Sequence, residues 1–215
     1  MKNNPTIITV LATVLLLFAS VNNVTAQEIK IGTQTWSTTN LDVTTFRNGV
    51  AIFEAKTDAE WKRAAYEGAP AWCYYDNDPA NGKKYGKLYN WYAVNDKRGL
   101  ASKGWHVPSD QEWTMLTGYL GGENVAGTKM KSKNGWEKST SHSTNTSGFA
   151  GLPGGYRYEA GSFDYIGNYG YWWSATDTNS ENRYAFMYSL DYDNGSALKG
   201  TKGKRNGISV RCIKD

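Results

Sequence analysis

His106 is the residue of this chain that most readily suggests acid–base or metal chemistry, because the pKa of an imidazole lies near neutrality. It stands beside Trp105. The other histidine, His142, lies in a polar loop, and no Cys or Glu stands at an offset typical of a metal site. The chain also lacks a Gly-x-Ser-x-Gly nucleophile motif and a phosphate-binding glycine loop. We therefore expect His106 to be structural, and an enzymatic interpretation is weak.

Two clusters of oxygen-bearing side chains could bind calcium. They are residues 76–78, Asp-Asn-Asp, and residues 191–194, Asp-Tyr-Asp-Asn. Neither cluster has the spacing of a calcium loop, and turn formation accounts for both more simply. We predict neither a metal nor another cofactor.

The two cysteines, Cys73 and Cys212, are the next candidates for chemistry. Cys212 alternates with Ile208 and Val210 in a predicted last strand, so its side chain should point inward. In an exported protein the pair favours a disulfide, and the alternative is two buried free thiols.

Aromatic residues interleave with glycines between positions 156 and 171, in loops that cannot bury every ring. Exposed Tyr and Trp rings can stack on sugar faces and offer a hydroxyl or N–H group. Trp172 and Trp173 should divide on a strand, with one facing the core and one facing out. The candidate ligand-binding residues are Tyr158, Tyr165, Tyr169, Trp172, Asp177 and Asn179.

A stretch at residues 199–206 concentrates four positive charges. A loop of this kind could favour an acidic polysaccharide or an envelope surface, although an ordinary solvated loop is the simpler interpretation.

The N-terminus has the pattern of an export signal: Lys2, an apolar run at residues 7–19, and small residues near position 26. Cleavage would remove only Lys2 from the 24 Lys and Arg, leaving 23 against 20 Asp and Glu, a formal charge of +3. This charge is too weak to indicate nucleic acid. The apolar run is too short to favour a membrane span. We expect a signal peptide at 1–26, one domain at 27–215, and a periplasmic, cell-surface or secreted location.

Capping boxes predict two of the helices that position these residues. Ser109 with Glu112 begins one whose stripe is Trp113, Leu116, Thr117 and Leu120, and Thr57 with Glu60 begins another. We expect a short helix at residues 88–95, with a strand as the alternative because of the crowded aromatic residues, and another helix at 122–132 with Val125 facing inward.

Strands are predicted in a hairpin at residues 28–38 and, in the second half, at 149–152, 156–158, 171–175, 184–192 and 208–213. Residues 153–155 should form a turn. Helices before strands indicate an α+β fold.

Six motifs in order resemble the Fibrobacter succinogenes major paralogous domain family. They are IGTQTW (31–36), YGKLYNWYAV (85–94), GWHVPSD (104–110), LPGGYR (152–157), YWWSAT (171–176) and SVRC (209–212). The family looks related to C-type lectin-like and formylglycine-generating-enzyme-like folds. The resemblance implies a lectin-like domain, with short helices on a small antiparallel sheet and with its N- and C-terminal strands together. Many members carry Cys-Pro where this chain has Ser102-Lys103, which leaves Cys73 and Cys212 as the possible pair.

The leading functional hypothesis is an exported, non-enzymatic binding module that contacts a glycan or cell-envelope polymer through Tyr-rich loops at residues 156–182. The alternative is a structural or adhesin module that binds protein partners through the same surface. A third interpretation, an oxidoreductase on the formylglycine-generating scaffold, requires a reactive thiol.

Overall fold

The computed structural model describes residues 27–137, 142–179 and 182–215. The predicted signal peptide and part of the polar loop at residues 133–148 lie outside these ranges. The described chain has a mixed α+β architecture, as expected, with the helices before residue 131 and the long strands after residue 153. Within these ranges no helix is both long and apolar enough to cross a membrane.

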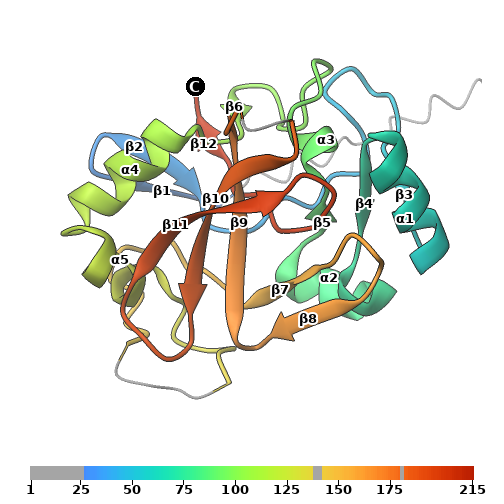
Figure 1. Ribbon diagram of the computed structural model, residues 1–215. Helices are drawn as coiled ribbons and strands as arrows, with labels where there is room; N and C mark the ends of the chain where they lie inside the picture. The colour runs from blue at the N-terminus through green and yellow to red at the C-terminus, as the bar shows by residue number, and fades with distance from the viewer. Residues whose placement is uncertain (1–26, 138–141, 180–181) are drawn as a thin grey trace, which may run out of the picture.

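The two ends of the domain share one sheet (Figure 1). Strands β1 (Glu28–Ile31) and β2 (Gln34–Ser37) form the predicted antiparallel hairpin. Strand β12 (Ile213–Lys214) lies between β2 and β6 (Trp105–His106), giving the order β1-β2-β12-β6. The predicted last strand is much shorter than residues 208–213, because Ile208 and Ser209 make only isolated bridges.

Both predicted capping boxes are present. Thr57 and Glu60 begin α1 (Asp58–Glu67), and Ser109 and Glu112 begin α4 (Asp110–Tyr119). Each box satisfies backbone N–H groups that the first turn leaves unpaired. Helix α5 (Glu123–Met130) follows, but Val125 is exposed rather than inward, and Ala126 and Met130 carry the buried face.

Short elements connect these helices. Strands β3 (Phe53–Glu54), β4 (Ala71–Cys73) and β5 (Leu88–Tyr89) form a three-stranded sheet. The turn η1 (Tyr75–Asn77) and helix α2 (Pro79–Tyr85) lie between β4 and β5. The helix predicted at residues 88–95 is reduced to α3 (Trp91–Val94), because Leu88 and Tyr89 pair with Cys73 and Trp72 in the sheet.

The second half forms two antiparallel sheets. Strands β7 (Gly154–Arg157) and β8 (Phe163–Ile166) pair with each other, and β9 (Tyr169–Asp177), β10 (Tyr184–Asp191) and β11 (Ala197–Gly203) form a sheet ordered β11-β10-β9. Gly154 and Gly155 belong to β7 rather than to a turn, and residues 149–152 contribute only a bridge at Gly151. The supposed basic loop is strand as far as Gly203.

Strand β9 has buried residues on both faces, which overturns one expectation. Trp172 packs with Trp36 and Trp113 in one core cluster, and Trp173 packs with Tyr89 in another. The two indoles do point in opposite directions, but both are completely buried. Figure 1 shows why: β9 runs through the centre, with α4, α5 and β1–β2 on one side and α1–α3 and β3–β5 on the other.

Candidate functional site

Four tyrosine rings, Tyr156, Tyr165, Tyr169 and Tyr171, form one continuous group that we call the tyrosine cluster. Tyr156 stacks on Tyr165 with centroids 5.8 Å apart, and Tyr169 stacks on Tyr171 at 5.6 Å. Edge contacts at 5.2 Å and 5.6 Å join the two pairs. None of the four rings is completely buried, so the cluster lies at the edge of the core and reaches the surface.

The pairing of β7 with β8 places two of these rings. Tyr156 on β7 lies opposite Asp164, and Tyr165 follows it with a φ of 67°. This left-handed conformation is unfavourable for a bulky side chain. The Tyr165 ring is also 51% exposed, so core burial does not account for the strained backbone.

Strand β11 brings a cation to the cluster. The ammonium of Lys202 lies 3.4 Å from the centroid of the Tyr156 ring and 4.8 Å from that of Tyr171. Burial lowers the pKa of Lys202, and Asp164 offsets part of this effect. The ammonium of Lys202 makes no hydrogen bond or ion pair within the part of the chain that the structure describes. Its closest partners are therefore the two ring faces, which attract a cation.

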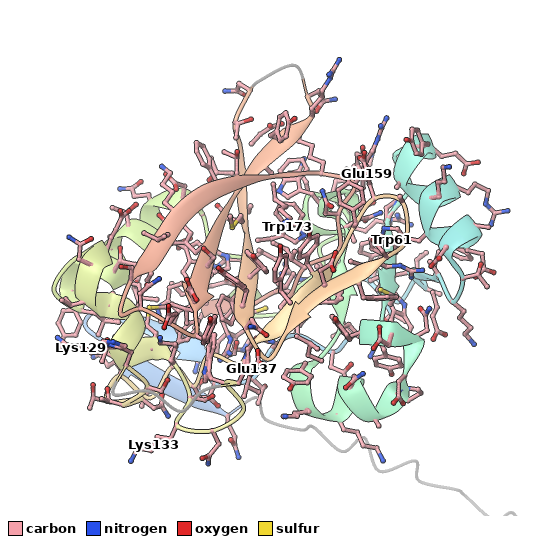
Figure 2. The ribbon with its side chains drawn as sticks, turned by 60° about the horizontal axis from the view of Figure 1, so that its bottom comes forward. Trp61, Lys129, Lys133, Glu137, Glu159 and Trp173 are labelled. Carbon is pink, nitrogen blue, oxygen red and sulfur yellow. The ribbon has the colours of Figure 1, made fainter. Side chains whose placement is uncertain are left out.

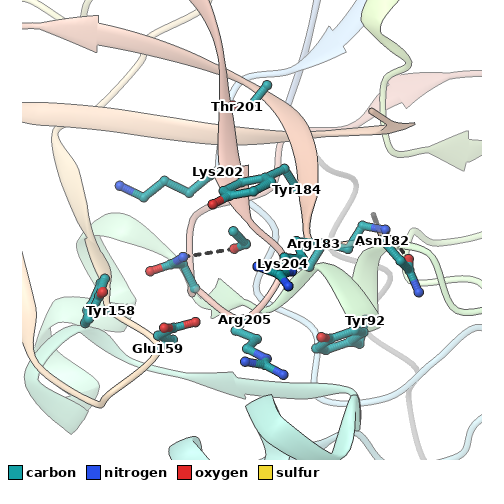
Figure 3. Close-up of a pocket in the computed structure, with 12 residues that line it drawn as sticks. Tyr92, Tyr158, Glu159, Asn182, Arg183, Tyr184, Thr201, Lys202, Lys204 and Arg205 are labelled. Atoms are coloured by element: carbon teal, nitrogen blue, oxygen red, sulfur yellow. Dashed lines mark hydrogen bonds between the residues drawn. The ribbon is translucent and has the colours of Figure 1, made fainter. Parts of the chain in front are cut away.

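Lys202 also borders a pocket of about 690 Å³, which we call the basic pocket (Figure 3). One wall comes from the turn after β7, with Tyr158 and Glu159, and the other from the start of β10 and the end of β11. In Figure 3 the ammonium of Lys202 and the ring of Tyr158 lie on the same side of the pocket. The lining residues with charged side chains are Glu159, Arg183, Lys202, Lys204 and Arg205.

The charges of the basic pocket are not equally available. The buried Lys204 ammonium donates to Asp177 Oδ2 at 2.7 Å and to Asn182 Oδ1, and it lies over the Trp91 ring. The Arg205 guanidinium lies 4.3 Å from the centroid of Tyr66 and makes no ion pair with any described residue. Lys202 and Arg205 are thus cations with free hydrogen-bonding capacity toward the pocket.

Arg157 supports the wall that carries Tyr158. Its side chain is fully buried, and Nε donates to the Gly161 carbonyl at 3.0 Å across the turn. Nη1 donates to the Ala55 carbonyl at 2.9 Å and Nη2 to Asp58 Oδ1 at 3.0 Å. These bonds join the turn to the beginning of α1 and hold one edge of the basic pocket in place.

The structure brings together three of the six predicted binding residues. Tyr165 and Tyr169 belong to the tyrosine cluster, and Tyr158 lines the basic pocket. Trp172 is fully buried, and its indole N–H donates to Asn40 Oδ1 at 2.8 Å, so it lies outside any surface site.

Asp177 accepts from Lys204, and Asn179 is exposed on the segment that follows β9. Neither residue lines the pocket. Tyr156 and Tyr171 belong to the predicted aromatic segment and Lys202 to the predicted basic stretch, but none of the three was among the six candidate binding residues. Alternation along β7 and β9 would have placed Tyr156 and Tyr171, but Lys202 lies beside them only through the tertiary packing of β11, which pairs with neither strand.

The predicted disulfide is absent. Cys73 and Cys212 are both buried free thiols, and they belong to different core clusters. Burial raises the pKa of each thiol to about 12, with Arg157 partly opposing this effect at Cys73 and Arg211 at Cys212. These environments keep the thiols protonated, which is the opposite of an activated cysteine.

The other candidates for chemistry are held by structural contacts. Nε2 and Nδ1 of His106 lie within hydrogen-bond distance of Glu112 and Asp215. In the 191–194 turn, the buried Lys131 ammonium donates to the carbonyls of Asp191 and Asn194. A lysine therefore occupies the position where a bound cation would meet these oxygens. No group of three or more possible metal-ligating His, Cys, Asp or Glu residues occurs among the described positions.

Comparison with known proteins identifies the family. No curated protein and no solved structure matches the chain. The profile described as the Fibrobacter succinogenes major domain matches residues 29–214, from the first strand to the last. The chain therefore belongs to the Fibrobacter succinogenes major domain family.

Proposed function

We propose that this protein is an exported, non-enzymatic binding module that recognises a glycan or another surface polymer through the tyrosine cluster and the basic pocket. The observation that carries the proposal is the junction of these two features at Lys202, which lines the pocket and lies on the rings of Tyr156 and Tyr171. A partly exposed aromatic surface thus continues into a polar recess.

The chemistry of the surface suits a sugar. Tyrosine rings offer flat apolar faces to the C–H groups of a pyranose and lose little rotamer freedom on binding. Burial and neighbouring acidic or phenolic groups raise the pKa of Tyr156 and Tyr169, so both hydroxyls stay protonated and can donate as well as accept. The strained backbone of Tyr165 supports a role in ligand contact, since strain of this kind gathers at functional sites.

Two further parts of the proposal concern the fold and the location. Family membership and the pairing of β2 with β12 support a C-type lectin-like arrangement in which the chain ends meet. The sequence pattern of residues 1–26 supports export to the periplasm, the cell surface or the medium.

A glycan array tests this function with a variant suited to the backbone. Glycine adopts the left-handed conformation of residue 165 without strain, so Tyr165→Gly removes the ring without straining the local backbone. We expect the wild-type protein to bind a subset of glycans and Tyr165→Gly to bind them at least about tenfold more weakly, as loss of one stacking ring implies. Tyr169→Ala should act in the same direction.

Tyr119→Ala is the matched control, because Tyr119 is an exposed tyrosine on α4, away from the pocket. It should bind as the wild type does. An array without bound glycans, or equal losses in Tyr119→Ala and Tyr165→Gly, would refute binding through the tyrosine cluster.

A protein partner is the second candidate, because tyrosine and arginine are enriched at the energetic centres of protein interfaces. Exposed Tyr158 and Tyr165, together with Arg205, would fit such a role. Capture of one defined protein from an envelope extract, lost in Tyr165→Gly and unaffected by added polysaccharide, would favour this alternative over glycan binding.

A further inference from the structure

We propose that the ligand of this surface is an acidic glycan, and that Lys202 binds the carboxylate of a uronic acid unit where the tyrosine cluster meets the basic pocket. This inference rests on the proposed glycan-binding function and narrows it to one chemical class.

The ammonium of Lys202 makes no ion pair with any described residue. An ammonium group that is withdrawn from water normally gains a carboxylate or several carbonyl partners, because an uncompensated charge is costly. The fully buried lysines follow this rule: Lys87 pairs with Asp42, Lys204 with Asp177, and Lys131 with two carbonyls. Lys202 is half-buried and makes no hydrogen bond or ion pair with any described side chain, although Asp164 acts on its charge; its ammonium lies on ring faces and borders a recess open to a ligand.

The second step is the charge of the recess. Among the described residues that line it, four are cationic and one, Glu159, is a carboxylate. Asp177 already neutralises Lys204, which leaves Lys202 and Arg205 to attract an anion. The Arg205 guanidinium lies over the Tyr66 ring, and its N–H groups remain for a carboxylate, which guanidinium binds well.

The third step is the position of the cation relative to the exposed rings. Tyr165 stacks on Tyr156, and Tyr156 in turn carries the Lys202 ammonium. A sugar that stacks on the exposed ring of Tyr165 is therefore separated from the cation by two rings, those of Tyr165 and Tyr156. The carboxylate of a uronic acid projects from the edge of its pyranose ring, so in a polymer one unit can stack on Tyr165 while another unit places its carboxylate at the ammonium. A neutral sugar would leave Lys202 unpaired.

The experiment compares charged polymers with neutral forms of the same backbone. Polygalacturonate, alginate and hyaluronate would each be tested beside their fully methyl-esterified forms, by affinity electrophoresis at fixed ionic strength. The variants are Lys202→Met, which removes the ammonium, and Lys202→Arg, which keeps a cation. Lys133→Met is the control for net charge, because Lys133 is an exposed lysine that points away from the body of the domain in Figure 2.

We expect the wild type to bind at least one uronate polymer and to bind its methyl ester at least about tenfold more weakly, the worth of one charge-assisted contact. Lys202→Met should lose the same factor for the charged polymer alone. Lys202→Arg should retain most of the binding, and Lys133→Met should match the wild type.

Three results would overturn the inference. If the wild type binds the esters or other neutral glycans as tightly as the uronates, glycan binding stands and the acidic class is wrong. The same conclusion follows if Lys133→Met and Lys202→Met lose equal affinity, because binding would then follow net charge. If no polymer of either kind binds and the array is also negative, the proposed function falls together with the inference.

Discussion

Nε2 of His106 lies 2.8 Å from Oε1 of Glu112, the carboxylate that also closes the capping box of α4. The other ring nitrogen lies 2.7 Å from Oδ1 of Asp215. One imidazole thus joins β6, the beginning of α4 and the last residue of the chain. In this arrangement the histidine beside the capping box links three segments of the fold.

The pairing predicts a pH-dependent contribution to stability. Burial lowers the pKa of His106, but hydrogen bonds to Glu112 and Asp215 outweigh it and raise the pKa above the ordinary value of 6.5. A base with a raised folded-state pKa stabilises fully below its unfolded value, and the contribution is lost as pH rises through the folded value. We expect the free energy of unfolding to fall above about pH 6.5 by about 0.5 kcal/mol, because the side chain is 38% exposed and solvent screens the pair.

Urea unfolding of the wild type and His106→Gln across about pH 5.5 to 8.5 measures this effect. The difference in unfolding free energy between the two proteins should shrink as pH rises. A constant difference would show that His106 does not carry the linkage.

The thiols of Cys73 and Cys212 should react only in the unfolded protein. Both are buried, and burial raises each pKa to about 12. Without a reducing agent, iodoacetamide should leave the native protein unmodified and add two carbamidomethyl groups in denaturant, as measured by intact mass. If the adducts form in denaturant only after reduction, a disulfide is present and the two cysteine environments described above are wrong.

Local signals predicted much of the fold. Each capping box, at Thr57 and at Ser109, spans only four consecutive residues, so both helix starts could be predicted from local sequence and were correct. The environments of Trp172 and Trp173 were predicted less well. Alternation showed that they face opposite ways, but it could not show that other elements cover both faces of β9. Which elements cover a strand depends on contacts between residues that are far apart in the chain.

The same distinction holds for the candidate site. Composition indicated an aromatic surface near Tyr165 and Tyr169, which the structure places in one cluster. The role of Lys202 was hidden, because it meets Tyr156 only through the packing of β11 near β7. The buried Lys204 was likewise assigned to a solvated loop, since its partner Asp177 lies 27 residues earlier in the chain.

Substitution of Arg157 should greatly reduce the stability of the fold. Its guanidinium is fully buried and donates to the carbonyls of Ala55 and Gly161 and to Asp58. Arg157→Met would leave the buried carbonyls of Ala55 and Gly161 unpaired, so we expect the free energy of unfolding to fall by about 3–5 kcal/mol. Chemical denaturation followed by tryptophan fluorescence measures this loss.

Two comparisons separate hydrogen bonding from charge in Arg157. Asp58→Asn should cost less than about 1 kcal/mol, because the Asp58 side chain is 71% exposed. Lys62→Met removes an exposed cation from α1 and should be nearly neutral. If Arg157→Met costs no more than Asp58→Asn, the buried carbonyl contacts contribute little and the turn before β8 needs another support.

Titration of Lys131 should make the fold more stable as pH rises in the alkaline range. This direction is opposite to that expected for His106. Its side chain is buried, and its ammonium donates to the carbonyl of Asp191 at 2.7 Å and to that of Asn194. Burial lowers the pKa from 10.5 to about 8, although Asp191 and Asp193 oppose this effect. Between these two values the unfolded chain binds more protons than the folded one, so stability must rise with pH.

Comparison with Lys131→Met isolates this contribution from the other groups that titrate at alkaline pH. The unfolding free energy of the wild type should gain about 2 kcal/mol relative to Lys131→Met between about pH 8 and pH 10, as the linkage relation requires. Guanidinium unfolding at several pH values in this window measures the gain. An unchanged difference would mean that the carbonyls and carboxylates of the 191–194 turn compensate fully for burial. The pKa of the Lys131 ammonium would then be the same in the folded and the unfolded chain.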